Sequence, residues 1–232
     1  MAGQMINDAL KAVGQLGDPR FRGVLLRGIG LSVAILLAFT VLMIWGAMAL
    51  IGPEVSLPWI GPVGWLDNAV GWTLVPVSLA MSVFLMVPVA SAFTGLFLDR
   101  IAEAVEDRHY PGLPPARQQS WSETIRESAG FLGLVIGVNI LALFAYLLLA
   151  PLALFIFWGV NGFLLGREYA QMSAARHLPA DEARAFRRNN RGSIWATGIL
   201  MAIPLSIPVV NLLVPVLGAA TFTHLFHRLN GR

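Results

Sequence analysis

The stretch "IPLSIPVVNLLVP", residues 203–215, decides how this chain folds. A soluble protein seldom contains so long an aliphatic run, and an ordinary transmembrane helix seldom contains three prolines, here Pro204, Pro208 and Pro215. Each proline removes a helical hydrogen bond, and backbone groups freed in this way are tolerated at membrane depth only against protein or water. We therefore predict that residues 192–220 form a helix–turn–helix hairpin that enters the bilayer and turns back. The alternative is one kinked, tilted transmembrane helix.

The composition of the whole chain indicates an integral membrane protein. Hydrophobic residues make up 56% of the 232 positions, charged residues make up 12%, and the mean hydropathy is +0.70. A soluble domain of this length needs more charge to cover its surface. A basic chain can indicate a nucleic-acid-binding protein, but in a membrane protein an excess of arginine reflects the topology. The net charge of +3 therefore leads us to expect no nucleic-acid partner. The absence of cysteine excludes disulfides, thiol nucleophiles and thiolate metal sites.

The apolar runs predict two membrane crossings and a second hairpin. Residues 28–51 carry no charge and would extend about 36 Å as a helix, enough to cross a bilayer. Residues 69–98 form the second crossing. The run 129–165 would extend about 55 Å as one helix, longer than a bilayer core of about 30 Å. We predict that it bends near Pro151 into two arms of marginal length.

Local patterns predict where several helices begin. Residues 5–16 place apolar side chains at helical spacing on one face, which favours a short helix in the membrane interface. Asp18 is suited to cap the next helix and Pro19 to occupy its first position. Ser120 and Glu123 have the spacing of a capping box. The N-terminal residues lack the apolar core of a signal peptide, so we expect none to be removed.

The distribution of basic residues predicts the topology. All sixteen Lys and Arg fall in four regions, which are residues 1–27, 100–126, 167–191 and the C-terminal positions 228 and 232. If the two long runs cross and both hairpins return, every basic residue lies on the cytoplasmic side, as the positive-inside rule requires. The predicted fold is thus a single all-α membrane domain over residues 1–232. It contains two full transmembrane helices, two partly penetrating helical hairpins and an interfacial N-terminal helix.

Three segments resemble a known family. They are "AIPLSIPVVNLLVPVLGAATFTHL" (202–225), "SAFTGLFLDRIAEAVE" (91–106) and "FWGVNGFLLGREYA" (157–170). Over roughly residues 15–226 the chain is similar to the CysZ sulfate permease family, which also includes a eukaryotic membrane protein named for its induction by etoposide. The resemblance implies an oligomeric, all-helical protein of the bacterial inner membrane. It also implies inward passage of sulfate for cysteine biosynthesis.

The chain departs from that family at three positions. In sulfate-transporting members the first long helix follows a Gly-apolar-Arg-Arg element proposed as an anion site. Here the equivalent is "DPRFRG", in which Phe21 separates Arg20 from Arg22. Arg27 stands where those members often have a proline, and Thr94 replaces an asparagine. These differences leave the substrate open between sulfate and a related oxyanion.

Arg20 and Arg22 are the candidate anion-binding residues. They lie where a helix is predicted to start, so that free backbone N–H groups and the positive end of the helix dipole face the same anion. The planar guanidinium also suits a tetrahedral oxyanion. The alternative is that both arginines only meet lipid headgroups. Further candidates for a pore or gate are Arg27, Thr94, Asn161, Glu168 and Asn211, which could instead reach the interface or bond across helices.

Other chemistry is not predicted. His224 and His227 are three residues apart, but no further metal ligand stands near them in the sequence, so we expect no metal site. Nucleotide-binding loops and the motifs of serine or zinc hydrolases are missing, so we expect neither an enzyme nor a cofactor. The sequence thus predicts a permease or channel for sulfate or a similar oxyanion, which acts as a homo-oligomer in the lipid bilayer. The alternatives are a membrane-organising scaffold and an accessory subunit of another transporter.

Overall fold

The computed structural model describes residues 2–51, 56–57, 61–62 and 97–231. The chain divides into two compact units, one of Met1–Leu25 with Leu96–Arg232 and one of Leu26–Gly95. In the second unit, most of helix α2 (Pro19–Ile51) is followed by the antiparallel pair β1 (Ser56–Leu57) and β2 (Gly61–Pro62). The predicted crossing over residues 69–98 and candidate Thr94 lie outside the described residues, apart from the last two positions of that crossing.

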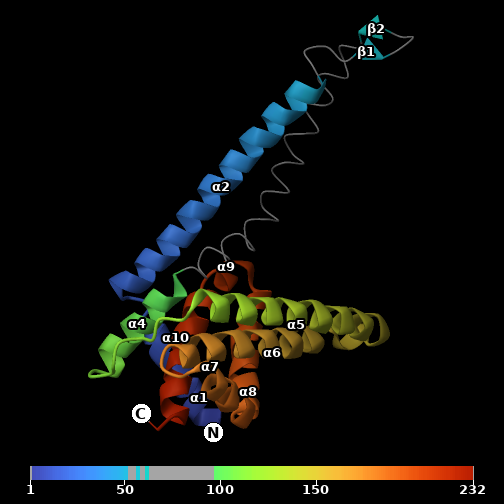
Figure 1. Cartoon of the computed structure of the whole chain (residues 1–232). Coiled ribbons are helices and arrows are strands. Elements are labelled where there is room, and N and C mark those ends of the chain that lie inside the picture. The colour runs from blue at the N-terminus through green and yellow to red at the C-terminus, as the bar shows by residue number, and fades with distance from the viewer. Residues whose placement is uncertain (1, 52–55, 58–60, 63–96, 232) are drawn as a thin grey trace. The chain divides into compact units, whose positions relative to one another are not determined.

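The first unit is built from helices. They are α1 (Ala2–Gly14), the start of α2, α4 (Leu98–His109), α5 (Trp121–Leu148), the 3₁₀ turn η1 (Ala150–Leu152), α6 (Ala153–Ala175), α7 (Ala180–Asn189), α8 (Arg191–Ala202), η2 (Ile203–Ser206), α9 (Pro208–Asn211) and α10 (Val214–Leu229) (Figure 1). Two helices begin at the capping residues predicted from the sequence. The backbone N–H of Arg20 donates to the Asp18 carboxylate, and Glu123 N–H donates to the Ser120 hydroxyl.

The helices α5 and α6 form a hairpin whose turn, η1, contains Pro151 (Figure 1). Both arms are longer than the sequence predicted. The helix α5 begins eight residues before the apolar run at 129, and α6 continues ten residues beyond 165. Among the described residues, three helical segments are long and apolar enough to cross a membrane: Pro19–Leu42, Trp121–Leu148 and Ala150–Ala175. The chain is a multi-pass membrane protein with more candidate spans in its described part than the two full crossings predicted for the whole chain.

The segment 192–220 is broken at its prolines. The helix α8 ends at Ala202, η2 and α9 follow, and α10 returns past α8 and contacts it (Figure 1). The described chain therefore has a helical hairpin here, and its depth in a bilayer stays a prediction. The helix α8 also crosses α6 very closely, because a Cβ built on Gly198 would lie 1.9 Å from the carbonyl oxygen of Gly162.

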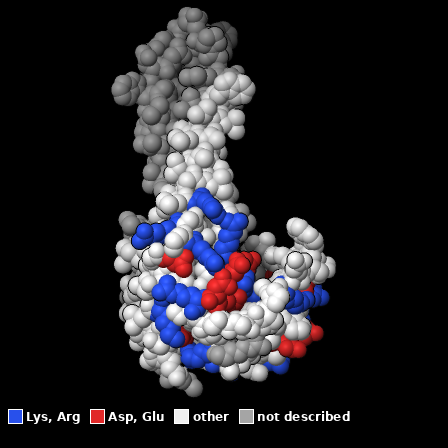
Figure 2. Space-filling view, turned by 90° about the vertical axis from the view of Figure 1, so that its left-hand side faces the viewer, with Lys and Arg blue, Asp and Glu red and all other residues white. Residues whose placement is uncertain are grey.

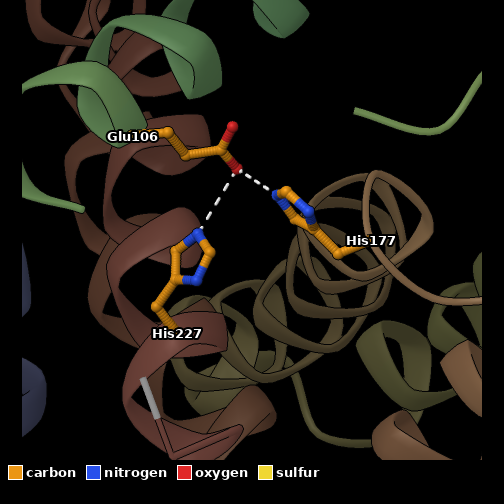
Figure 3. Close-up of side chains that lie close together, drawn as sticks. All are labelled: Glu106, His177 and His227. Atoms are coloured by element: carbon orange, nitrogen blue, oxygen red, sulfur yellow. Dashed lines mark hydrogen bonds and ion pairs between the residues drawn. The ribbon is translucent and has the colours of Figure 1, made fainter. Parts of the chain in front are cut away.

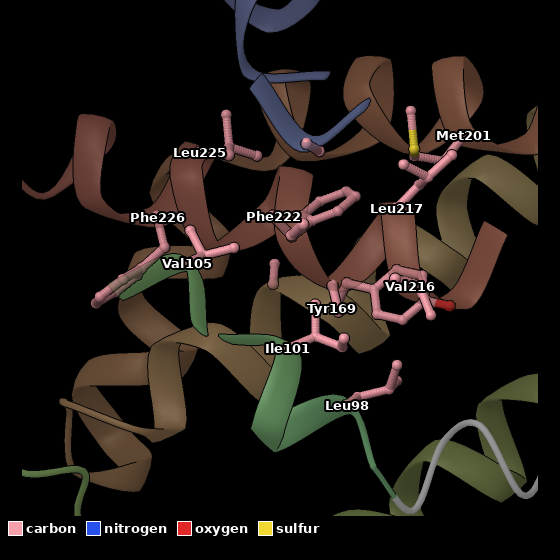
Figure 4. Close-up of a cluster of buried hydrophobic side chains, with 14 of the residues drawn as sticks. Leu98, Ile101, Val105, Tyr169, Met201, Val216, Leu217, Phe222, Leu225 and Phe226 are labelled. Carbon is pink, nitrogen blue, oxygen red and sulfur yellow. The ribbon is translucent and has the colours of Figure 1, made fainter. Parts of the chain in front are cut away.

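The centre of this unit is α10, whose residues Val214–His227 are all buried. It packs against α1, α4, α6 and α8. Figure 4 shows Phe222 and Phe226 of α10 near side chains of α4 and α6, including Val105 and Tyr169. By contrast, Ala142 is the single buried residue of α5. The apolar residues of α5 thus face outward, whereas those of α10 form the core.

The large apolar residues of helix α1 are exposed, and its buried face carries Asp8 and Ala12. Its apolar residues Ile6, Leu10 and Val13 are at least half exposed, whereas Asp8 is buried against the protein, as is Gln15 just after the helix end. Two contacts hold this segment in place. The guanidinium of Arg228 donates to Asp8 at 2.7 and 2.9 Å, and the Gln15 amide donates to the carbonyl of Ala104 at 3.0 Å. The apolar face is left free, as an interfacial helix requires.

Candidate functional site

The first turn of α2 carries the two arginines that the sequence singled out. Asp18 precedes the helix and accepts the N–H of Arg20 at 2.9 Å, and Pro19 follows as the first helical residue. Phe21 and Val24 turn into the core, which leaves Arg20 and Arg22 exposed. The helix start thus presents both guanidinium groups to solvent, but the Asp18 carboxylate already satisfies one of its backbone donors.

The two arginines differ in their partners. Arg20 Nη1 lies 2.5 Å from Oδ2 of Asp107 on α4, and both side chains are more than half exposed. Within the described residues, Arg22 forms neither an ion pair nor a side-chain hydrogen bond. Basic and acidic side chains lie next to one another over the helical body on the face drawn in Figure 2. An anion at this helix start would find Arg22 available and would compete with Asp107 for Arg20.

The other sequence candidates are dispersed. Arg27 is exposed on α2, Glu168 is exposed on α6, and Asn211 is half-buried at the end of α9. The amide of Asn161 donates to the carbonyl of Phe157 in its own helix at 2.8 Å. In the described chain, no hydrogen bond or ion pair joins one of these residues to another. Their assignment to a pore or gate stays a prediction.

A buried charged cluster lies at the C-terminal half of α4, and we did not predict it from the sequence. Oε1 of Glu106 lies 2.8 Å from Nε2 of His177, which follows α6, and 3.3 Å from Nε2 of His227 on α10 (Figure 3). Arg176 donates to Oε2 at 2.8 Å from Nη2 and to Oε1 at 3.3 Å from Nε. The Glu106 side chain is 10% exposed, so this carboxylate links three segments inside the protein.

The surroundings of Glu106 keep it ionised. Burial raises the pKa of its carboxyl, but the hydrogen bonds from His227, Arg176 and His177 lower it more, and the pKa falls from 4.5 to about 2. For Arg176 the balance has the opposite sense. Burial lowers the pKa of its guanidinium, and the contacts with Glu106 and Asp99 raise it above the usual value. Each member therefore holds the other in its charged form.

The remaining histidines adjoin this cluster. The ring of His227 lies 4.3 Å from the ring of Tyr110, whose hydroxyl lies 3.0 Å from Nδ1 of His224. His109 makes an edge contact with the ring of His224 at 4.8 Å. All four histidines of the chain thus lie around the end of α4. Burial, followed by the nearby cationic groups, lowers the pKa of His224 to about 3, so this imidazole is neutral at physiological pH.

The sequence contained one signal for this cluster. Ile101, Ala102 and Val105 form the buried stripe of α4, and Glu106 continues that stripe one turn after Ala102. An acidic residue within an apolar stripe indicates a buried partner. Its identity was not accessible, because His177 and His227 lie 71 and 121 residues further along the chain.

Comparison with known proteins gives the family. No curated protein matches the chain. The sequence model of the family described as "Sulfate transporter CysZ/Etoposide-induced protein 2.4" matches residues 8–215, which is most of the 232 residues. This match confirms the resemblance seen in the three sequence segments, and it agrees with a helical chain that has several candidate membrane spans. The chain is a membrane protein that belongs to the Sulfate transporter CysZ/Etoposide-induced protein 2.4 family.

Proposed function

We propose that this protein passes sulfate, or a similar tetrahedral oxyanion, across the bacterial inner membrane for sulfur assimilation. The description of its family names a sulfate transporter, which favours transport over catalysis. The observation that carries the proposal is the first turn of α2. There Arg22 is exposed without an ion-pair partner in the described chain, next to Arg20, at the start of a helix of membrane-spanning length. Helix starts and arginine forks both favour oxyanions.

The contact between Arg20 and Asp107 suggests how binding is controlled. In the absence of substrate, Asp107 supplies the negative charge that Arg20 requires. An arriving oxyanion would compete with Asp107 for Arg20, whereas Arg22 is available to an anion without such competition. Because the pair is largely exposed, its own contribution to stability is small, and the exchange costs little.

The membrane arrangement follows from charge and exposure. Many apolar residues of α5 are exposed, Leu141 and Leu147 by more than two-thirds, and these would face lipid or a second copy of the chain in a homo-oligomer. The beginning of α5 and the end of α6 carry Arg126 and Arg167, so both ends of this hairpin belong at the cytoplasmic side. The free apolar face of α1 would lie in the cytoplasmic interface.

Sulfate uptake into proteoliposomes tests the two arginines. We expect Arg20→Ala/Arg22→Ala to reduce uptake at least about tenfold, because two charge-assisted contacts, at about 1.5 kcal/mol or more each, are lost. Asp107→Asn should lower the sulfate concentration for half-maximal uptake, because Arg20 is no longer occupied. Arg184→Ala is the matched control, since this exposed arginine pairs with Asp181 on α7. Undiminished uptake by the double variant would remove the site from the proposal.

A further inference from the structure

We infer that Glu106, His177 and His227 form a binding site for a divalent transition-metal ion of the Zn²⁺ type. The sequence alone predicted no metal site, because only two of the chain's histidines are neighbours along it. The fold brings one carboxylate and two imidazoles together from α4, the segment after α6, and α10 (Figure 3). The inference is independent of the proposed transport activity.

The geometry of the three donor atoms suits one ion. Oε1 of Glu106 and the two Nε2 atoms all lie within 4.8 Å of one another, and Oε1 is 2.8 and 3.3 Å from the two nitrogens. Ligand atoms bound at about 2.0–2.2 Å in a tetrahedral zinc site lie roughly 3.4 Å apart. The ion therefore requires small side-chain movements and no rearrangement of the helices.

The donor set also indicates the class of ion. Two neutral imidazoles and one carboxylate are typical ligands of Zn²⁺ and related metals, whereas Mg²⁺ and Ca²⁺ prefer oxygen ligands alone. The side chains of His177 and His227 are 3% and 0% exposed, so water competes little for their nitrogens. Three protein ligands leave a fourth position for water or another small ligand.

Arg176 determines how the carboxylate is presented. Its shorter contact, 2.8 Å from Nη2, is to Oε2, the oxygen that neither histidine contacts. The longer contact, 3.3 Å from Nε, is to Oε1. A ligating carboxylate is commonly oriented by such an outer hydrogen bond. The arginine thus directs Oε1 toward the two imidazoles, and its positive charge moderates the affinity for the ion.

Metal titration of the purified, chelator-treated full-length protein in detergent tests the site. We expect about one Zn²⁺ per chain, and visible absorption bands when Co²⁺ is bound by nitrogen and oxygen ligands. Glu106→Gln, His177→Gln and His227→Gln should each weaken Zn²⁺ binding by at least about tenfold, since losing even an outer-shell partner costs that much. His109→Gln is the matched control, because His109 adjoins the cluster, is exposed, and is not among the three ligands.

Two outcomes would overturn the inference. One is a wild-type protein that binds no Zn²⁺, and the other is binding that the three ligand variants weaken no more than His109→Gln does. Because a ligand variant can fail to fold, X-ray absorption of Zn²⁺ bound to the wild type provides a second measurement. We expect two imidazole nitrogens and carboxylate oxygen at about 2.0–2.2 Å. A shell of water oxygens alone would contradict the site.

Discussion

The helices α5 and α10 are both rich in apolar residues, but their environments are opposite. Of the 28 residues of α5, only Ala142 is buried, whereas α10 is buried from Val214 to His227. The helix α5 is long and apolar enough to span a bilayer, where lipid can cover its exposed side chains. The helix α10 is shorter and carries Thr221, His224 and His227, which require polar partners. Hydrophobicity alone therefore does not distinguish a membrane-facing helix from a core helix.

The difference shows where polar groups are stabilised in this protein. His224 and His227 of α10 meet Tyr110 and Glu106 at the end of α4, and the Asp8 carboxylate of α1 meets Arg228. These contacts surround α10 and supply partners that lipid cannot supply. We therefore expect substitutions around α10 to affect stability strongly and substitutions on α5 to affect it little.

The largest effect is expected at Glu106. Glu106→Ala leaves Arg176 and two histidines inside the protein without their carboxylate, which should cost about 3–5 kcal/mol of unfolding free energy. Denaturant titration in mixed micelles measures this loss. Glu103→Ala, one turn earlier on the exposed side of α4, is the control and should change stability by at most about 0.5 kcal/mol. Equal losses of unfolding free energy in the two variants would show that Glu106 does not anchor α10.

A direct test of the comparison uses one leucine from each helix. Leu225 on α10 is 1% exposed and Leu147 on α5 is 73% exposed. We expect Leu225→Ala to cost about 3 kcal/mol, because it leaves a cavity in the core, and Leu147→Ala to cost much less. The same titration compares them. A large loss for Leu147→Ala would mean that protein, and not lipid or detergent, covers α5.

Acid should destabilise the α10 environment before it affects α5. The folded protein keeps His224 neutral down to about pH 3, whereas the unfolded chain protonates it below about 6.5. Stability therefore falls as the pH falls, by about 2 kcal/mol between pH 6.5 and 4.5, a range in which Glu106 contributes little. Thermal unfolding at several pH values measures this slope. His224→Gln should flatten it, and an unchanged slope in that variant would contradict the assignment.

The smallest effect is expected where α1 meets α10. Asp8→Asn weakens two charge-assisted hydrogen bonds from Arg228 and should cost about 1–2 kcal/mol. Asp181→Asn is the matched control, because its pair with Arg184 is largely exposed and contributes little. Limited proteolysis should release the N-terminal segment faster in the first variant alone. Equal rates would indicate that packing, and not this ion pair, holds α1.

Much of the fold was predictable from local patterns. Asp18, Ser120 and Pro151 mark two helix starts and a turn through backbone chemistry that depends on a few neighbouring residues. The arms of the α5–α6 hairpin were underestimated, because the helices continue through polar residues on both sides of the apolar run. Hydropathy records the apolar part of a helix and not its ends.

In the candidate sites too, features set by neighbouring residues were predictable and features set by tertiary contacts were not. Arg20 and Arg22 were identified because a helix start and its arginines are adjacent in sequence. The pairing of Arg20 with Asp107 was not predictable, since 87 residues separate them. The cluster around Glu106 depends even more on tertiary structure, because it forms only when α4, α6 and α10 pack together. Contacts of this kind have no short sequence motif.

Radiolabelled sulfate uptake by liposomes that contain the purified wild-type protein shows whether this protein is a sulfate permease. Empty liposomes and liposomes with the Arg20→Ala/Arg22→Ala variant serve as the comparison. We expect uptake by the wild type that exceeds that of empty liposomes and that the variant largely loses. A folded wild-type protein that passes no more sulfate than empty liposomes would contradict a sulfate permease. That result would favour another anion, a membrane scaffold or an accessory subunit.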